Sequence, residues 1–355
     1  MTTPFETPPE PGAGIEVAPG VIWLRLPLPM KLDHVNCYAF ADDDGWTLID
    51  TGFDSCKSRA IWQAMLSDGP LAGRPVARII ATHHHPDHIG LAGWFQAQGA
   101  ELLTTRTAWL MARMLVLDEQ DRPAPQALAF WRRAGMPPEM LASRAAERPF
   151  NFADTVHPLP LGYTRLSDGS RLRFGGRDWV VRTGDGHAPE HATFWDLSGD
   201  LVIGGDQLLP GISPNLGVYP TEPDADPVAE WLASCRRLAG YATPDQLVLP
   251  GHKLPFRGLP ARLADLVANH VSALDRLEAA LARGPRHAAG CFDILFKRRI
   301  GAGEYGLALV EAVAHLNNLA RAGRIEPAGQ DEHGAVLWRA VTNALQAGDR
   351  PTEIG

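Results

Sequence analysis

The sequence predicts an α/β protein in which two successive sets of strands and helices pack as a sandwich, followed by a mainly helical C-terminal module. Three observations support this prediction. Apolar segments of strand length alternate with helical segments between residues 20 and 260. A helical stretch at about residues 107–150 divides that alternation into two halves. From residue 261 onward helical periodicity dominates, and two short strands follow.

The first half is expected to hold strands that are rich in β-branched and aromatic residues and bounded by Pro, Gly or acidic turns. These strands are residues 21–26, 36–40, 46–50, 76–81 and 101–104. Helical spacing at residues 58–66 and 92–98 predicts one helix before and one helix after the fourth strand along the chain. Residues 1–19 are expected to be a disordered tail and not a signal peptide, because the first fourteen lack a basic start and an apolar core.

The stretch at about residues 107–150 is expected to be a helical cap inserted into the domain formed by residues 20–260. Apolar residues at helical spacing recur near 109–117, 127–134 and 138–146. Such a stripe is common in a protein core, yet an insertion after a polar loop is also a natural wall for a substrate site. Strand-rich sequence resumes at residues 171–174, 179–182, 193–196, 201–203 and 247–249, with hairpin turns at 175–176 and 198–200.

A concentration of histidine follows the strand at residues 76–81. Four histidines and one aspartate occupy six positions, as His83, His84, His85, Asp87 and His88. Neutral histidine is a nitrogen ligand for transition metals, and aspartate adds an oxygen donor. His83 and His85 are expected on one side of an extended turn, because alternate residues share a face. The proline that follows them would bend the chain, so that Asp87 and His88 turn toward a second centre. The alternative is a solvated histidine-rich loop.

Ligand-type residues also follow other predicted strands, each close to a glycine. They are Asp50 in Asp-Thr-Gly, His187 and His191 in a Gly-rich segment, Asp206 after Gly-Gly, and His252 after Pro-Gly. Glycine lets the backbone turn sharply and approach an ion closely. A turn-capping role is the alternative for Asp50. The repetition at several strand ends predicts a metal site.

The residues His83-x-His85-x-Asp87-His88 resemble the HxHxDH signature of the metallo-β-lactamase superfamily, and later ligand-type residues occur in the superfamily's order. The resemblance covers about residues 20–260 and implies an αββα sandwich with a dinuclear metal site at one edge. It assigns His83, His85 and His187 to the first metal, Asp87, His88 and His252 to the second, and Asp206 to both. It also implies that Asp50 orients a ligand histidine, and that His84 and His191 are not ligands.

The chemistry implied by this resemblance is hydrolysis. Two divalent cations about 3.5–4 Å apart lower the pKa of a shared water and provide a hydroxide near neutral pH. The hydroxide attacks a carbonyl or phosphoryl centre, one metal stabilises the resulting oxyanion, and the leaving group takes a proton through Asp87 or water. Zinc is the expected metal, and Fe or Mn suit the same nitrogen and oxygen ligands.

With a bridging aspartate at position 206, the chain resembles the glyoxalase II, lactonase and nuclease branches of the superfamily. True β-lactamases of this fold lack that bridge. We therefore expect a metal-dependent hydrolase that cleaves a thioester, a lactone or a related ester of a small anionic substrate. The alternative is a phosphodiesterase or endoribonuclease that acts on single-stranded RNA. Two further alternatives are a one-iron persulfide dioxygenase and a non-catalytic module that keeps metals for structure; the complete ligand set disfavours both.

Four residues are candidates for contact with substrate. Lys253 and Arg257 follow a predicted ligand and could hold a carboxylate or phosphate group. Tyr219 could reach the oxyanion, as a tyrosine does in some lactonases of the superfamily. His34, on the loop before the second strand, could line the rim. Surface charge or ordinary packing is the alternative for each of them.

Residues 261–355 are expected to form a helix and a winged-helix-like domain. Helical spacing at residues 262–283, 291–299 and 305–322 precedes a hairpin near 323–326 and 336–338. This order resembles the tail of a superfamily group that includes an animal endoribonuclease. Nucleic-acid binding needs a basic face, but eight Lys and Arg balance eight Asp and Glu from residue 285 to 355. We expect packing, homodimer formation or a pocket wall instead.

The whole composition is consistent with a small-molecule enzyme. The 33 Lys and Arg and 41 Asp and Glu give a net charge of −8, so there is no overall basic field for nucleic acid or anionic membrane. No apolar run has the length needed to span a bilayer. The four cysteines are scattered without a CxxC pair, which argues against disulfides and thiolate zinc sites. We expect a cytoplasmic location.

Overall fold

A computed structural model describes residues 1–199 and 201–341 of the chain. The chain forms two compact units. The first comprises residues 1–123, 147–216 and 227–268; the second comprises 124–146, 217–226 and the chain from 269 onward. Of the predicted C-terminal domain, residues 342–355 lie outside the described part, as does Asp200 in the predicted turn at 198–200.

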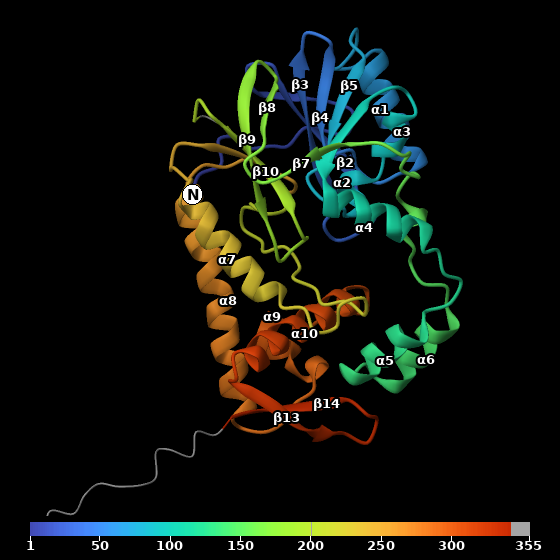
Figure 1. The fold of residues 1–355 in the computed structure, drawn as a ribbon, viewed down its shortest axis with the longest axis vertical. Coiled ribbons are helices and arrows are strands. Elements are labelled where there is room, and N and C mark those ends of the chain that lie inside the picture. Colours follow the sequence, from blue (N-terminus) through green and yellow to red (C-terminus); the bar gives the residue numbers. More distant parts are fainter. Residues whose placement is uncertain (200, 342–355) are drawn as a thin grey trace, which may run out of the picture. The chain divides into compact units, whose positions relative to one another are not determined.

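The first unit contains two β-sheets that face each other (Figure 1). The seven-stranded sheet follows chain order, with antiparallel pairing from β1 to β4 and parallel pairing from β4 to β7. Its strands are β1 (Ile15–Ala18), β2 (Val21–Pro27), β3 (His34–Asp42), β4 (Gly45–Ile49), β5 (Val76–Ile80), β6 (Glu101–Thr105) and β7 (Thr164–Leu166).

The five-stranded sheet has the order β12-β11-β10-β9-β8 and is antiparallel except for the parallel pair of β11 and β12. Its strands are β8 (Arg171–Phe174), β9 (Arg177–Gly184), β10 (His191–Asp196), β11 (Leu201–Gly205) and β12 (Leu247–Pro250). The predicted turn at Gly175 and Gly176 joins β8 to β9, and both glycines have the positive φ that a tight hairpin requires.

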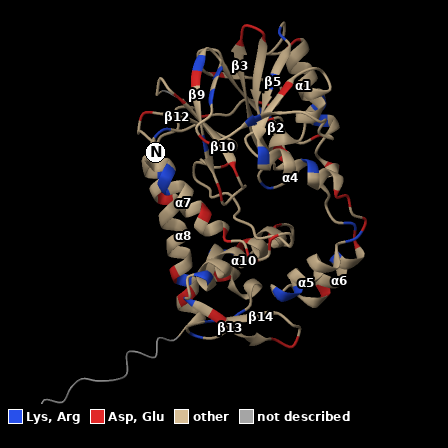
Figure 2. Ribbon diagram, viewed as in Figure 1, with Lys and Arg blue, Asp and Glu red and all other residues tan. Residues whose placement is uncertain are grey.

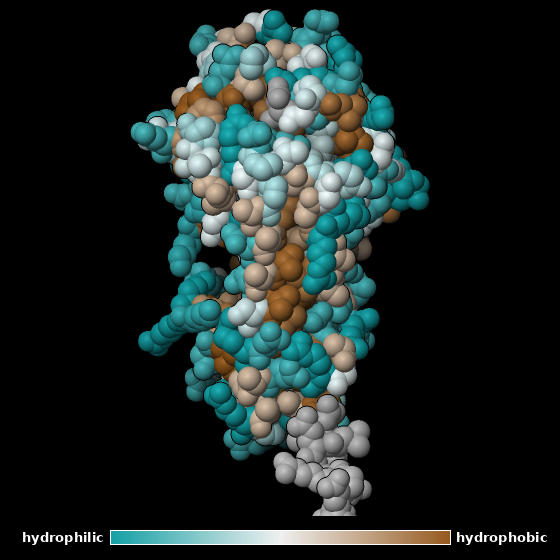
Figure 3. All heavy atoms as spheres, turned by 90° about the vertical axis from the view of Figure 1, so that its left-hand side faces the viewer, coloured by the Kyte–Doolittle hydropathy of each residue, from teal (hydrophilic) through white to brown (hydrophobic). Residues whose placement is uncertain are grey.

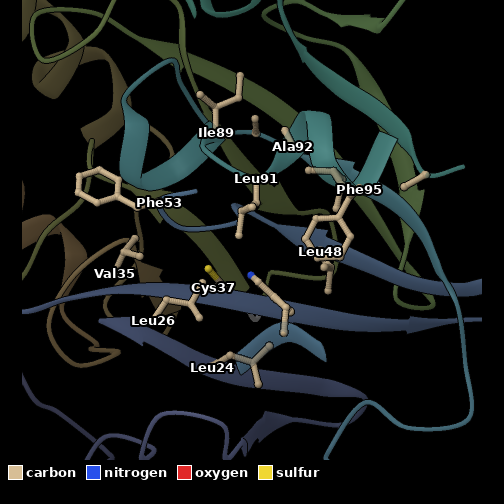
Figure 4. Packing of buried hydrophobic residues seen from close by; sticks show 14 of the residues in the cluster. Leu24, Leu26, Val35, Cys37, Leu48, Phe53, Ile89, Leu91, Ala92 and Phe95 are labelled. Atoms are coloured by element: carbon tan, nitrogen blue, oxygen red, sulfur yellow. The ribbon is translucent and has the colours of Figure 1, made fainter. Parts of the chain in front are cut away.

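Two apolar layers hold this unit together. One lies between the sheets, where Trp23 and Phe40 of the first sheet meet Trp179 and Phe194 of the second. The other covers the opposite face of the first sheet, where side chains from the segments around α2 and α3 pack on β2, β3 and β4 (Figure 4). Alternate residues of β2 and β3 supply the two layers, as the period of a strand buried on both faces dictates.

Helices cover the outer faces of both sheets, so the predicted αββα layer order is confirmed. Helices α1 (Cys56–Ser67) and α3 (Ala92–Gln96) contribute Trp62 and Phe95 to the core over the first sheet. Helix α7 (Pro227–Ala239) packs against β9 of the second sheet. The remaining helical elements of the first unit are α2 (Pro86–Ile89), α4 (Arg106–Leu117) and η1 (Phe152–Asp154).

The second unit is mainly helical, and α8 (Leu259–Leu281) runs into it from the first. Its other elements are α5 (Pro125–Arg133), α6 (Pro138–Ala146), η2 (Ala288–Cys291), α9 (Phe292–Phe296), η3 (Ala302–Glu304), α10 (Tyr305–Arg321), β13 (Ile325–Gln330) and β14 (Val336–Ala340). Strands β13 and β14 form an antiparallel hairpin that follows α10 along the chain. The winged-helix-like domain stays a prediction.

Several features differ from the predictions, and two of them, β7 and α7, lie in segments for which no element was predicted. Residues 15–18 of the predicted tail form β1, because their backbone pairs with β2 at the sheet edge. The predicted cap is divided, since α4 belongs to the first unit whereas α5 and α6 belong to the second. The predicted helix at 291–299 ends at Phe296, where Lys297 adopts a left-handed conformation with φ of 52°.

The surface and the cysteines agree with the composition. On the face shown in Figure 3 hydrophilic residues predominate around smaller hydrophobic patches. None of the helices within the described residues combines the length and the apolar character that crossing a bilayer demands. All four cysteines are free thiols, three of them buried.

Candidate metal centre

The histidine-rich segment leaves the end of β5 and forms a single helical turn. His85 precedes this turn and Pro86 is its first residue, a position where the fixed φ of proline suits a helix start. The structure thus has the one-turn helix α2 in place of the simple bend predicted after the proline. Asp87 and His88 of this turn form a group with His252, whereas His83 and His85 form a group with His187; His83 and His88 also come together in a third group with Asp206.

The first group brings together His83, His85 and His187, the last from the loop after β9. Nδ1 of His85 lies 3.0 Å from Nε2 of His83 and 3.0 Å from Nε2 of His187. Three ring nitrogens at this separation can converge on one ion. The sequence prediction placed the same three residues together.

The second group brings together Asp87, His88 and His252, the last from the loop after β12. Oδ2 of Asp87 lies 3.3 Å from Nε2 of His252 and 3.6 Å from Nε2 of His88. Both histidines are buried, whereas Asp87 is partly exposed. Gly251 is required beside them, because a Cβ there would lie 2.3 Å from Oδ1 of Asp206.

Asp206 lies between the two groups. Its Oδ2 is 3.4 Å from Nε2 of His187 in the first group. The same oxygen is 3.5 Å from Nε2 of His88 and 3.3 Å from Nε2 of His252 in the second. One carboxylate therefore faces ring nitrogens of both groups, as a bridging ligand must.

Three of the clustered histidines donate a hydrogen bond from the outer ring nitrogen to a carbonyl or carboxylate oxygen. Nδ1 of His187 donates to the carbonyl of Asn215 (2.9 Å), and Nδ1 of His252 donates to the carbonyl of His34 (2.7 Å). Nδ1 of His88 donates to Oδ2 of Asp50 (2.8 Å). Because the proton sits on Nδ1, the Nε2 lone pair of each of these rings points into the cluster, an arrangement typical of metal-binding histidines.

Asp50 fixes two parts of the cluster from behind. Its carboxylate accepts hydrogen bonds from the backbone N (2.8 Å) and hydroxyl (2.9 Å) of Thr82 as well as from His88. The Thr82 hydroxyl is 3.0 Å from Nδ1 of His83 and accepts from it, since its own proton is donated to Asp50. Asp50 itself has a φ of 59°, so its backbone is held in a conformation that non-glycine residues rarely adopt.

Burial and neighbouring charges both shift the pKa values of the cluster. Burial, reinforced by neighbouring imidazoles, holds the pKa of His83 well below its usual value. Burial would also lower the pKa of His252, but Asp206 and Asp87 raise it to about 10. The pKa of Asp206 lies well below its usual value because His252 and His88 outweigh the effect of burial. The buried carboxylates thus favour positive charge beside them, which a proton on His252 or a bound cation can supply.

The residues present suit divalent metal ions. Nε2 of His88 and Oδ1 of Asp206 are buried and have no hydrogen-bond partner within the described residues. Buried polar atoms are rarely left in this state unless a water or an ion completes them. Nitrogen and carboxylate oxygen donors, without cysteine, are suitable ligands for Zn, Fe or Mn.

The other candidate residues occupy different settings. Lys253 follows His252 directly and its side chain is exposed. The guanidinium of Arg257 donates to the carbonyl of Asp245, outside the cluster. His34 is buried, and both its ring nitrogens are engaged, with Asp33 and with the backbone N of Lys253. Tyr219 lies in the second unit and is 46% exposed.

Two histidines of the motifs remain outside the ligand groups. The ring of His191 stacks on that of His83, with centroids 4.4 Å apart, and its Nε2 accepts from the backbone N of Asp206 (3.1 Å). His84 is buried and its ring is parallel to that of Phe152. Both therefore support the cluster from outside its ligand groups.

Sequence reasoning did not identify Thr82, Asn36 and Tyr38. Thr82 could have been noticed because it directly precedes the first ligand. Asn36 and Tyr38 alternate on one strand, which places their side chains on the same face. Their hydrogen bonds reach residues more than 200 positions away, and no local pattern reveals such partners.

The family follows from this fold and from comparison with known proteins. Residues 30–279 match the metallo-β-lactamase superfamily, and residues 274–340 match the metallo-β-lactamase-like C-terminal domain. The chain therefore belongs to the metallo-β-lactamase superfamily, and it is a metallo-hydrolase of that superfamily.

Relatives of known structure resemble almost the whole chain. A β-lactamase domain protein from Burkholderia ambifaria is 36% identical, with a TM-score of 0.85 over 96% of this chain and 98% of its own. The metallo-β-lactamase family protein TTHA1429 from Thermus thermophilus is 28% identical, with a TM-score of 0.75 over 92% of this chain and 100% of its own.

A relative found by sequence covers a smaller part of the chain. The probable metallo-hydrolase YqjP from Bacillus subtilis is 26% identical over 246 residues, which are 68% of this chain and 74% of that protein.

Proposed function

We propose that this protein is a dinuclear metallohydrolase that cleaves the acyl bond of a thioester, a lactone or a related ester in a small anionic molecule. The position of Asp206 carries the proposal, because one carboxylate oxygen lies within 3.5 Å of ring nitrogens from both ligand groups. His83, His85 and His187 would hold one ion, and Asp87, His88 and His252 the other. Zinc is the proposed metal.

Divalent ions bound there would supply Lewis acidity and lower the pKa of water enough to provide a nucleophile near neutral pH. The protein's own residues would then orient and transfer protons. Asp87 is suited to proton transfer because its carboxylate is partly exposed beside the buried histidines. It would accept the proton released by the attacking water and pass it to the departing thiolate or alkoxide.

Lys253 supports an anionic substrate. Its side chain is exposed and directly follows His252, so an ammonium group lies next to the cluster along the chain. A lysine in this place would hold a carboxylate or phosphate of the substrate as a point charge. Arg257 and His34 are less suited to this task, because their polar groups are already engaged. An oxyanion contact from Tyr219 remains a prediction.

The test is a substrate panel with the zinc-, manganese- and iron-loaded protein. The panel contains thioesters, lactones, bis-p-nitrophenyl phosphate and single-stranded RNA. We expect turnover of at least one acyl substrate, and a lower kcat in Asp87→Asn at retained fold. Turnover of RNA or the phosphodiester alone would contradict the acyl-hydrolase proposal and favour the phosphodiesterase alternative.

A further inference from the structure

Side chains of β3 hold the loop that carries His252. Nδ2 of Asn36 donates hydrogen bonds to two carbonyls of this loop, those of Pro250 (2.9 Å) and Lys253 (2.8 Å). The hydroxyl of Tyr38 donates to the same Pro250 carbonyl (2.9 Å). Asn36 and Tyr38 are 1% and 2% exposed, so the two bonds to Pro250 are shielded from water and the bond to Lys253 is partly shielded.

The backbone of β3 adds to this attachment. The backbone N of Asn36 donates to the carbonyl of Gly251 (2.7 Å), and the carbonyl of His34 accepts from Nδ1 of His252 (2.7 Å). Every residue from 250 to 253 is therefore bonded to one short stretch of β3.

The loop needs this attachment for two reasons. Lys253 has a φ of 68°, a left-handed conformation that a side chain disfavours and that only surrounding contacts maintain. Gly251 passes so close to Asp206 that a small displacement of the loop would move His252 relative to its neighbours. Nε2 of His252 lies 3.3 Å from both Asp87 and Asp206 only while the loop keeps its present course.

We infer that the side chains of Asn36 and Tyr38 are positioning residues, which hold residues 250–253 so that His252 faces the second metal site and Lys253 faces outward. This inference rests on the proposed ligand assignment. The first site depends much less on this loop, because His83, His85 and His187 lie on other segments and only the shared Asp206 contacts the loop. Loss of the attachment should therefore weaken the second site selectively.

The test measures two successive zinc affinities by competition with a chromophoric chelator. Asn36→Leu removes the two amide hydrogen bonds, and Tyr38→Phe removes only the hydroxyl. We expect Asn36→Leu to bind the second zinc ion about 10–100-fold more weakly, with a smaller loss in Tyr38→Phe and an unchanged first affinity in both. Asn151→Leu is the matched control, because Asn151 is buried and its Nδ2 also donates to two backbone carbonyls, those of Gln120 and Pro149. Both affinities should be unchanged in that variant.

Three results would overturn the inference. The first is that Asn36→Leu binds the second zinc ion as tightly as the wild type. The second is that Asn36→Leu and Asn151→Leu both weaken both sites to the same extent, which indicates general destabilisation. If Asn36→Leu does not fold, Tyr38→Phe tests the inference in its place. The third contradicting result is then a Tyr38→Phe variant that binds the second zinc ion as tightly as the wild type. A wild-type protein that binds fewer than two zinc ions would instead refute the ligand assignment itself.

Discussion

The proton on the outer nitrogen of a histidine determines whether its inner nitrogen can bind a metal. In this protein Asp50 and the carbonyls of Asn215 and His34 accept that outer proton. Each acceptor comes from a different segment of the first unit, so the packing of the sandwich orients the rings. We therefore expect the residues behind the proposed ligands to contribute to metal affinity as well.

The bridging position of Asp206 can be tested by Asp206→Ala. Removal of the carboxylate leaves the Nε2 atoms of His88, His187 and His252 without the oxygen that joins their groups. We expect the metal content, measured by mass spectrometry after dialysis, to fall well below two per chain. Retention of two ions in this variant would contradict the ligand assignment.

The orienting role of Asp50 can be tested by Asp50→Ala. The variant removes the acceptor for His88 and the partner of Thr82, so we expect metal affinity to fall about 10–100-fold in chelator competition. Asp54→Ala is the control, because Asp54 lies in the same loop but pairs with Arg59. Equal metal affinities in the two variants would show that Asp50 does not orient the ligands.

At the scale of elements, a buried histidine pair joins α8 and α10. Nδ1 of His315 donates to the carbonyl of Glu311 (2.9 Å), so its Nε2 is an acceptor and faces Nδ1 of His270 at 3.4 Å. Burial, with a contribution from His315, lowers the pKa of His270 to about 3. Burial also lowers the pKa of His315. The pair therefore packs in its neutral form.

This pair should make stability depend on pH. In the unfolded chain His270 binds a proton near pH 6.5, whereas in the folded protein it does so only near its lowered pKa. Its contribution to the free energy of unfolding is therefore fully present above about pH 6.5 and is lost as the pH falls. We expect the free energy of unfolding to fall less between about pH 7 and about pH 5 in His270→Leu than in the wild type. Denaturant titrations at both pH values measure this, and parallel pH profiles would contradict it.

The elements also show what sequence can predict. Strands rich in apolar residues, such as β2, β3 and β5, occur where the local pattern placed them. The missed strands β1 and β7 have four and three residues, and they exist through pairing with a neighbouring strand. The residues of the clustered groups could be picked out because they follow strands in a recognisable order; their role as ligands stays a prediction. The bonds of Asn36 could not be predicted, because folding alone brings β3 to the loop after β12.

At the scale of the whole molecule, charge supports a small-molecule enzyme. The net charge is −8, and Figure 2 shows acidic and basic residues interspersed along the elements of both units. Phosphate recognition over a long nucleic acid would need a continuous basic face. A role in packing or dimerisation for the C-terminal domain remains our proposal.

Metal removal should destabilise the molecule. Without cations, folding buries Nε2 of His88 and Oδ1 of Asp206 without a hydrogen-bond partner within the described residues, so bound metal should stabilise the folded state. We expect a chelator to lower the melting temperature and zinc to restore it; free zinc at 100 times its Kd adds about 2.7 kcal/mol per site. Magnesium serves as the control ion. A melting temperature unaffected by either treatment would contradict a metal site in this cluster.

The most direct test of a dinuclear centre is a crystal structure of the zinc-loaded protein with diffraction data on both sides of the zinc absorption edge. The proposed ligand groups predict two anomalous peaks per chain, one among His83, His85 and His187 and the other among Asp87, His88 and His252, with Asp206 in contact with both. A single peak, or peaks away from Asp206, would contradict the dinuclear assignment.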